Sequence, residues 1–123
     1  MKNKILIVDD ELPLLNALVD KFSGAGFSVI TAENGQDGLK SALKNKPDLI
    51  LLDIIMPVMD GNIMLEKLRK DPWGKNVKVI MLTNLSDPGT ITKSAIKTED
   101  DYLIKADWKI EDIVLQVKNI LKE

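Results

Sequence analysis

Five short aliphatic runs, separated by stretches with helical spacing, constrain the fold of this chain more than any other feature. The runs span residues 4–8, 27–31, 47–53, 77–82 and 101–104. Aliphatic runs of this length indicate strands that are buried on both faces, as the strands of a parallel sheet are. Because helical stretches separate the runs, the alternation predicts an α/β domain in which helices cover both faces of a five-stranded parallel sheet.

Length and composition limit the number of domains and the available chemistry. With 123 residues, of which 45% are hydrophobic, the chain is predicted to form one domain over residues 1–123. It contains no cysteine and no histidine, so disulfides, thiol nucleophiles and imidazole ligands are excluded. A net charge of −2 predicts no direct binding to nucleic acid. The apolar segments are too short to predict a signal peptide or a membrane span, so we expect a cytoplasmic protein.

Turn and cap residues mark where the predicted helices begin and end. Pro13 fits the first turn of the first helix, and Gly24-Ala25-Gly26 is better explained as the end of that helix than as a dinucleotide-binding loop. Asn34 is expected to cap the second helix, and Gly61 to open the third. Residues 87–97 include Pro, Gly and several β-branched residues, so we expect a short, late-starting or mobile helix there.

Polar residues stand at the ends of four aliphatic runs: Asp9 and Asp10, Asp53, Thr83, and Lys105. Open parallel sheets bind ligands outside the carboxyl ends of their strands, so these residues are predicted to share one rim. Three crowded carboxylates repel one another unless a cation neutralises them, and Mg²⁺ suits such oxygen ligands. A simpler alternative is that Asp9 and Asp10 only cap a helix and that Asp53 only starts a turn.

The same rim contains the parts of a phosphoryl-transfer site. Asp53 is the candidate nucleophile, because carboxylates form acyl-phosphate intermediates. Thr83 offers a hydroxyl donor, and Lys105 offers a positive charge for the phosphoryl oxygens.

A set of motifs runs through the chain: Asp9-Asp10, then Asp53 followed by Met56-Pro57-Val58-Met59-Asp60-Gly61, then Thr83, then Tyr102 with Lys105 three positions on. Together these motifs resemble the receiver domain of two-component response regulators, and the match covers essentially the whole chain. The resemblance implies a doubly wound, flavodoxin-like sheet with strand order 2-1-3-4-5.

The resemblance also implies the roles of the residues at the rim. Asp53 accepts a phosphoryl group from the phosphohistidine of a sensor histidine kinase or a histidine phosphotransfer protein. Asp10, Asp53 and the backbone carbonyl of Ile55 ligate Mg²⁺, and Asp9 acts through a bound water. Thr83 and Lys105 hold the phosphoryl oxygens.

A switch is implied by the same resemblance. Once Asp53 is phosphorylated, the hydroxyl of Thr83 moves toward the new oxygens and leaves space that Tyr102 can fill. The face formed by residues 88–97, the strand of Tyr102 and the last helix would then change. We therefore expect a stand-alone signalling switch that acts on a downstream protein target, and phosphorylation-dependent dimerisation is left open.

Three other functions would be compatible with parts of this sequence. A phosphatase with an aspartyl nucleophile needs a second acid two residues after Asp53, where this chain has Ile55. An interaction domain that works without phosphate would keep the fold but would not respond to Mg²⁺ or a phosphodonor. A nucleotide-binding domain lacks its phosphate loop here. We therefore expect a phosphoacceptor that assists its own phosphorylation and dephosphorylation, and not an enzyme.

Overall fold

The computed structural model describes residues 3–53, 56, 58–83, 101–104 and 109–121, with only the backbone of Thr83 and of residues 101–104. The elements follow in the order β1 (Lys4–Val8), α1 (Leu12–Gly24), β2 (Ser28–Ala32), α2 (Gly35–Asn45), β3 (Leu49–Asp53), α3 (Gly61–Arg69), β4 (Lys78–Thr83), β5 (Asp101–Ile104) and α4 (Ile110–Leu121). The helix predicted within residues 87–97 lies outside the described residues.

All the strand pairs are parallel, and the five strands lie in the order β2-β1-β3-β4-β5. This order confirms the predicted doubly wound α/β fold. After β2 the chain crosses back over β1 to form β3, so the order of the strands reverses between β1 and β3. The carboxyl ends of these two central strands therefore flank the crevice in which such sheets bind ligands.

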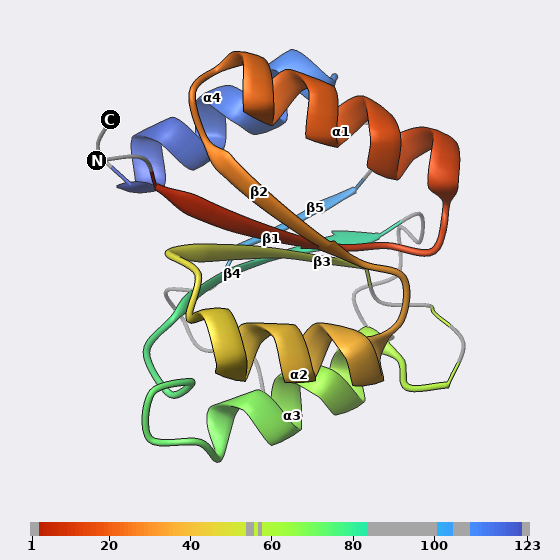
Figure 1. Cartoon of the computed structure of the whole chain (residues 1–123), viewed down its shortest axis with the longest axis vertical. Helices are drawn as coiled ribbons and strands as arrows, with labels where there is room; N and C mark the ends of the chain where they lie inside the picture. Colours follow the sequence, from red (N-terminus) through yellow and green to blue (C-terminus); the bar gives the residue numbers. More distant parts are fainter. Residues whose placement is uncertain (1–2, 54–55, 57, 84–100, 105–108, 122–123) are drawn as a thin grey trace.

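Each face of the sheet has its own hydrophobic core, because successive side chains of a strand point to opposite faces. Helices α1 and α4 cover one face, and α2 and α3 cover the other (Figure 1). The side chains of residues 5–8 and 49–52 are fully buried. Burial on both faces explains why β1 and β3 are continuous aliphatic runs and not alternating ones.

Helix α1 ends in the way its glycines predicted. Gly26 has a φ of 97°, in the left-handed region that glycine adopts without strain. The Phe27 amide donates to the Phe22 carbonyl oxygen at 3.1 Å, and the Gly26 amide donates to Ser23 at 3.1 Å. The Phe22 and Phe27 rings meet edge to face with centroids 5.4 Å apart. These contacts form a Schellman cap, and no dinucleotide loop is present at this position.

The predicted helix starts are confirmed as well, and Pro13 lies in the first turn of α1. The Asn34 side chain accepts a hydrogen bond from the Asp37 amide at 2.8 Å, and α2 begins at the next residue, Gly35. Helix α3 begins at Gly61, where Asp60 is the cap and accepts from the Ile63 amide at 2.9 Å. Each cap satisfies an amide that would otherwise lack a partner in the first turn.

Gly35 allows α2 to approach the loop that follows β3, and an added side chain there is expected to destabilise the fold. Its amide donates to the Met59 carbonyl oxygen at 2.9 Å, and a Cβ at this position would overlap that same oxygen. We expect Gly35→Ala to lower the free energy of unfolding by about 1–3 kcal/mol, measured by urea denaturation.

Gly24→Ala is the matched control, because a Cβ there meets nothing within 4 Å. Alanine also favours a helix over glycine, so this variant should be at least as stable as the original chain. Equal stabilities of the two variants would contradict the close approach at Gly35.

Candidate functional site

Three aspartates come together at the carboxyl edge of the sheet. Val8 and Leu52 are paired in neighbouring strands, and Asp9 and Asp53 are the residues that follow them. Asp10 comes next, before the start of α1. One carboxylate oxygen from each aspartate lies within 4.8 Å of the other two. The sheet therefore gathers the three acids that the sequence placed at its rim.

The cluster is buried at its base and open at its outer side. The exposed fraction is 0% for Asp9 and 5% for Asp53, whereas Asp10 is exposed. Burying carboxylates costs free energy unless hydrogen bonds or a cation compensate for the lost hydration. A cation that enters from the side of Asp10 would meet all three oxygens, and an anion could then approach the same opening.

Asp9 also has a local structural role. Its amide donates to the Ala32 carbonyl oxygen at 3.1 Å, which ties the end of β1 to the end of β2. Its Oδ1 accepts a hydrogen bond from the Glu11 amide at 2.9 Å and so shapes the turn that leads into α1. Asp9 therefore holds the turn before α1 but does not cap the helix, because Glu11 is the N-cap residue and no side chain caps it. A turn alone does not explain why Asp10 and Asp53 converge on Asp9.

The donor set fits a small divalent cation. Ligand atoms around octahedral Mg²⁺ are about 3 Å apart when adjacent and about 4.2 Å apart when opposite, given bonds of about 2.1 Å. A spread of up to 4.8 Å among the three oxygens is close to this shell, and a small inward movement or one bridging water would complete the match. Carboxylates are hard ligands, which favours Mg²⁺ over metals that prefer nitrogen or sulfur.

The turn that leads into α3 is held from two sides. The Gly35 amide donates a hydrogen bond to the Met59 carbonyl oxygen, and the Asp60 side chain caps the first turn of α3. Between Asp53 and these anchors, Val58 is 77% exposed and has a φ of 68°, which is an unusual conformation for a β-branched residue. An Asp before a helix is a cap signal, so Asp60 could have been found from the sequence. No sequence signal marks the contact made by Gly35 or the conformation of Val58.

The other predicted site residues are only partly within the described structure. Ile55 and Lys105 lie outside the described residues. Thr83 is the last residue of β4, and it follows Leu82, which pairs with Asp53. Tyr102 lies in β5 opposite Met81, and Ile104 is opposite Thr83. The backbone therefore brings β4 and β5 to the same edge, but the side chains of Thr83 and Tyr102 are not described.

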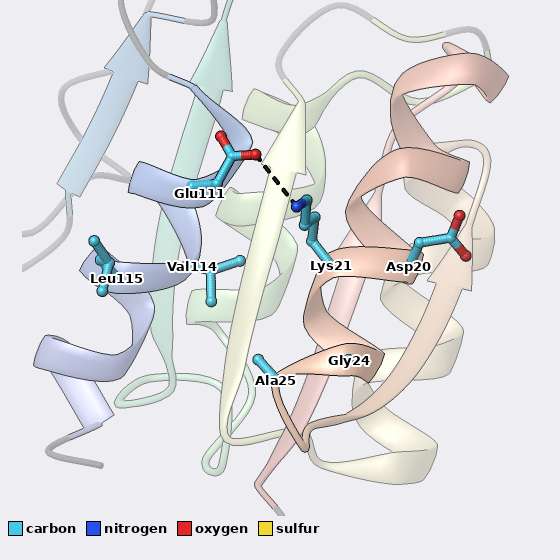
Figure 2. Close-up of a pocket in the computed structure, with 7 residues that line it drawn as sticks. All are labelled: Asp20, Lys21, Gly24, Ala25, Glu111, Val114 and Leu115. Atoms are coloured by element: carbon cyan, nitrogen blue, oxygen red, sulfur yellow. Dashed lines mark ion pairs between the residues drawn. The ribbon is translucent and has the colours of Figure 1, made fainter.

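A cavity of about 670 Å³ lies elsewhere, between α1 and α4 (Figure 2). Its lining includes Gly24 and Ala25, at the opposite end of α1 from Asp9 and Asp10. Lys21 and Glu111 form an ion pair of 3.3 Å across it. A backbone hydrogen bond at Glu111, and then the contact with Lys21, keep the pKa of Glu111 below its ordinary value. Both side chains are exposed, so this pair contributes little to stability.

A doubly wound sheet with an acidic cluster at its reversal point is typical of phosphoacceptor signalling domains. Comparison with known families gives the same class, because the sequence model for the response regulator receiver domain matches residues 5–118. The chain belongs to this family, which is part of two-component signalling. Members of this class are phosphoacceptors and not conventional enzymes.

Individual relatives support the assignment. The transcriptional regulatory protein PrrA of Mycobacterium tuberculosis is 35% identical over 119 residues, which are 97% of this chain and 50% of PrrA. The chain thus spans about half the length of this curated relative. The receiver domain of a signal transduction histidine kinase from Syntrophus aciditrophicus is 31% identical, with a TM-score of 0.85 over 98% of this chain and 90% of that one.

A third relative was solved with bound groups. It belongs to the CheX-CheY-BeF₃-Mg²⁺ complex of Borrelia burgdorferi and is 27% identical, with a TM-score of 0.83 over 97% of this chain and 89% of that one.

Within the part of our chain that the structure describes, every helix is too short or too polar to cross a membrane.

Proposed function

We propose that residues 1–123 form one receiver domain that takes a phosphoryl group onto Asp53 in a Mg²⁺-dependent reaction. The observation that carries this proposal is the convergence of Asp9, Asp10 and Asp53, with two of the three carboxylates buried. A nucleophile at the end of a buried strand is held in one place, and one of its oxygens lies within 4.8 Å of an oxygen of the exposed Asp10. The phosphodonor is a phosphohistidine on a sensor histidine kinase or a histidine phosphotransfer protein, which would act on this domain in the cytoplasm.

The metal site proposed here uses the side chains of Asp10 and Asp53 and the backbone carbonyl of Ile55, with Asp9 acting through a water. Bound Mg²⁺ would supply positive charge that offsets the crowded carboxylates and attracts the incoming phosphoryl group. The Borrelia CheY in complex with BeF₃ and Mg²⁺ supports this choice of metal. The spread of the oxygens in our chain, within 4.8 Å, supports it independently.

The proposed transfer is a displacement at phosphorus. An Asp53 carboxylate oxygen attacks the phosphorus atom and forms an acyl phosphate, while the phosphorus–nitrogen bond of the donor breaks. The imidazole leaves with the bonding electron pair and takes up a proton. Thr83 would donate a hydrogen bond to one phosphoryl oxygen, and Lys105 would contribute a positive charge to another.

Phosphorylation would then act on a distant face through Thr83 and Tyr102. Pairing of β4 with β5 joins the strand of Thr83 to the strand of Tyr102, so a shift of one strand end can be passed to the other. We propose that the changed face, which includes β5 and α4, binds a downstream protein target.

The test is to incubate the chain with acetyl phosphate, with and without Mg²⁺, and to measure its intact mass. One added phosphoryl group is expected only when Mg²⁺ is present. Hydroxylamine should remove the group, because it cleaves acyl phosphates but leaves phosphate esters of Ser and Thr intact. Failure to add any group, despite a folded chain that binds Mg²⁺, would favour an interaction domain that works without phosphate.

A further inference from the structure

A second cavity, of about 470 Å³, lies at the opposite edge of the sheet from the aspartate cluster. Its lining includes Lys46 and Pro47, which precede β3, and Asn76 and Lys78 at the start of β4. Pro72 and Trp73, from the turn after α3, also line it. We call this cavity the amino-edge pocket, and nothing in the proposed phosphoryl transfer uses it.

The two segments that form the amino-edge pocket are strongly basic. Residues 44–48 and 69–78 contain six cationic side chains and two acidic ones, Asp48 and Asp71. Both acids are engaged by backbone amides. Asp48 Oδ2 accepts from the Lys4 amide at 2.7 Å, and Asp71 Oδ2 accepts from the Trp73 and Gly74 amides at 2.9 Å each. The charged residues that line the pocket are Lys46, Lys78 and Asp48, all exposed, so the two lysines outnumber one carboxylate whose Oδ2 already accepts the Lys4 amide.

The turn that carries Trp73 is held rigidly in place. The Arg69 Nη1 donates to the carbonyl oxygens of Gly74, Lys75 and Val77 at 2.9, 3.3 and 2.8 Å. Gly74 packs against the backbone of Leu68 without room for a Cβ. Because these bonds fix the turn before any ligand arrives, a partner would lose little free energy in ordering it.

We propose that the amino-edge pocket is a docking site for an acidic segment of a partner protein. Charge complementarity selects the partner, because Lys46 and Lys78 attract acidic side chains, whereas the aspartate cluster at the other edge repels them. Trp73 is partly buried against the core, and with Pro47 and Pro72 it offers an apolar surface to one side chain of the partner.

Protein is favoured over nucleic acid as the occupant for two reasons. The pocket is a small local hollow of about 470 Å³ with two lining lysines, whereas phosphate backbones are usually bound along extended basic surfaces. The chain as a whole has a net charge of −2, which gives no long-range attraction for a polyanion. A short acidic sequence needs only the local charge at the pocket.

The test is a titration of the ¹⁵N-labelled chain at low salt, followed by NMR, with three probes. The first is a short Glu-rich peptide with one central Leu, the second is the same peptide with Gln at every Glu, and the third is a short single-stranded DNA. The acidic peptide is expected to shift the signals of Lys46, Lys78 and the Trp73 indole, and to bind more weakly as salt is added. The Gln peptide and the DNA are expected to bind more weakly than the acidic peptide.

Charge reversal supplies the matched variants. The double variant Lys46→Glu/Lys78→Glu should bind the acidic peptide about tenfold more weakly than the unaltered chain does. Two charge reversals elsewhere, Lys21→Glu/Lys40→Glu, should change the affinity for this peptide less than about twofold. Lys78 Nζ also donates to the Ile120 carbonyl oxygen at 3.3 Å, so Lys46→Glu alone is included as a variant that leaves this bond intact. Tighter binding of the DNA or the Gln peptide, self-association of the chain through this pocket, or equal losses in the two double variants would each overturn the proposal.

Discussion

Asp53→Asn is expected to abolish the Mg²⁺-dependent addition of a phosphoryl group. The amide of Asn has nearly the same size and shape as the carboxylate, but it is neutral and does not form the acyl phosphate. Asp53 is 5% exposed, and removing one of three crowded negative charges does not threaten its packing. Intact mass measurement after treatment with acetyl phosphate and Mg²⁺ should therefore show the unmodified variant only.

Asp20→Asn is the control for this substitution. Asp20 is an exposed aspartate in α1, outside the cluster, and its replacement removes the same charge from the chain. It should accept one phosphoryl group to the same extent as the unaltered chain. If Asp53→Asn is still phosphorylated, or if peptide mapping places the group on another residue, Asp53 is not the acceptor.

Asp10→Asn is expected to have opposite effects on stability with and without metal. Without Mg²⁺, it removes one of three mutually repelling charges and should raise the free energy of unfolding by about 1 kcal/mol. With Mg²⁺ at about 100 times its Kd, the unaltered chain should gain about 2.7 kcal/mol, or on the order of 10 °C in Tm. The variant should lose most of this gain, because one ligand has become neutral. Thermal unfolding with Mg²⁺ and with EDTA measures both effects.

Asp10 is a better choice than Asp9 for this experiment, because the side chain of Asp9 also accepts a hydrogen bond from the Glu11 amide and its replacement would disturb the turn before α1. Asp37→Asn is the control, since Asp37 is exposed in the first turn of α2 and does not belong to the cluster. It should respond to Mg²⁺ as the unaltered chain does. A full Mg²⁺ response in Asp10→Asn would remove Asp10 from the metal site.

Most of the architecture was predictable from local patterns. Residues 5–8 of β1 and 49–52 of β3 are all buried and all aliphatic, as expected for strands covered on both faces. Asn34 and Gly26 act within a few residues of their own positions, so their cap roles follow from residue type and place. The strand order came from the family resemblance, because local patterns do not specify which strands pair across long connections.

The candidate site was predicted only in outline. The sequence showed that Asp53 ends one predicted strand and that Asp9 follows another. Parallel pairing of these two strands was enough to place both residues on one edge of the sheet. The contact between Gly35 and the Met59 carbonyl was not visible, because it joins the start of α2 to the turn before α3, and their approach depends on how α2 packs. The left-handed conformation of Val58 was equally hidden, since the surrounding structure imposes it against the preference of the residue.

By itself, the amino-acid sequence determined the α/β alternation, the helix caps and the acids available at the strand ends. These depend on the spacing of apolar residues and on hydrogen bonds between near neighbours, which act over a few residues. Only the tertiary structure decided that three carboxylate oxygens lie within 4.8 Å of one another, and that Lys46, Lys78 and Trp73 line one pocket at the opposite edge. Such distances between residues far apart in the chain are set by how whole helices and strands pack, because each contact depends on the position of every element beneath it.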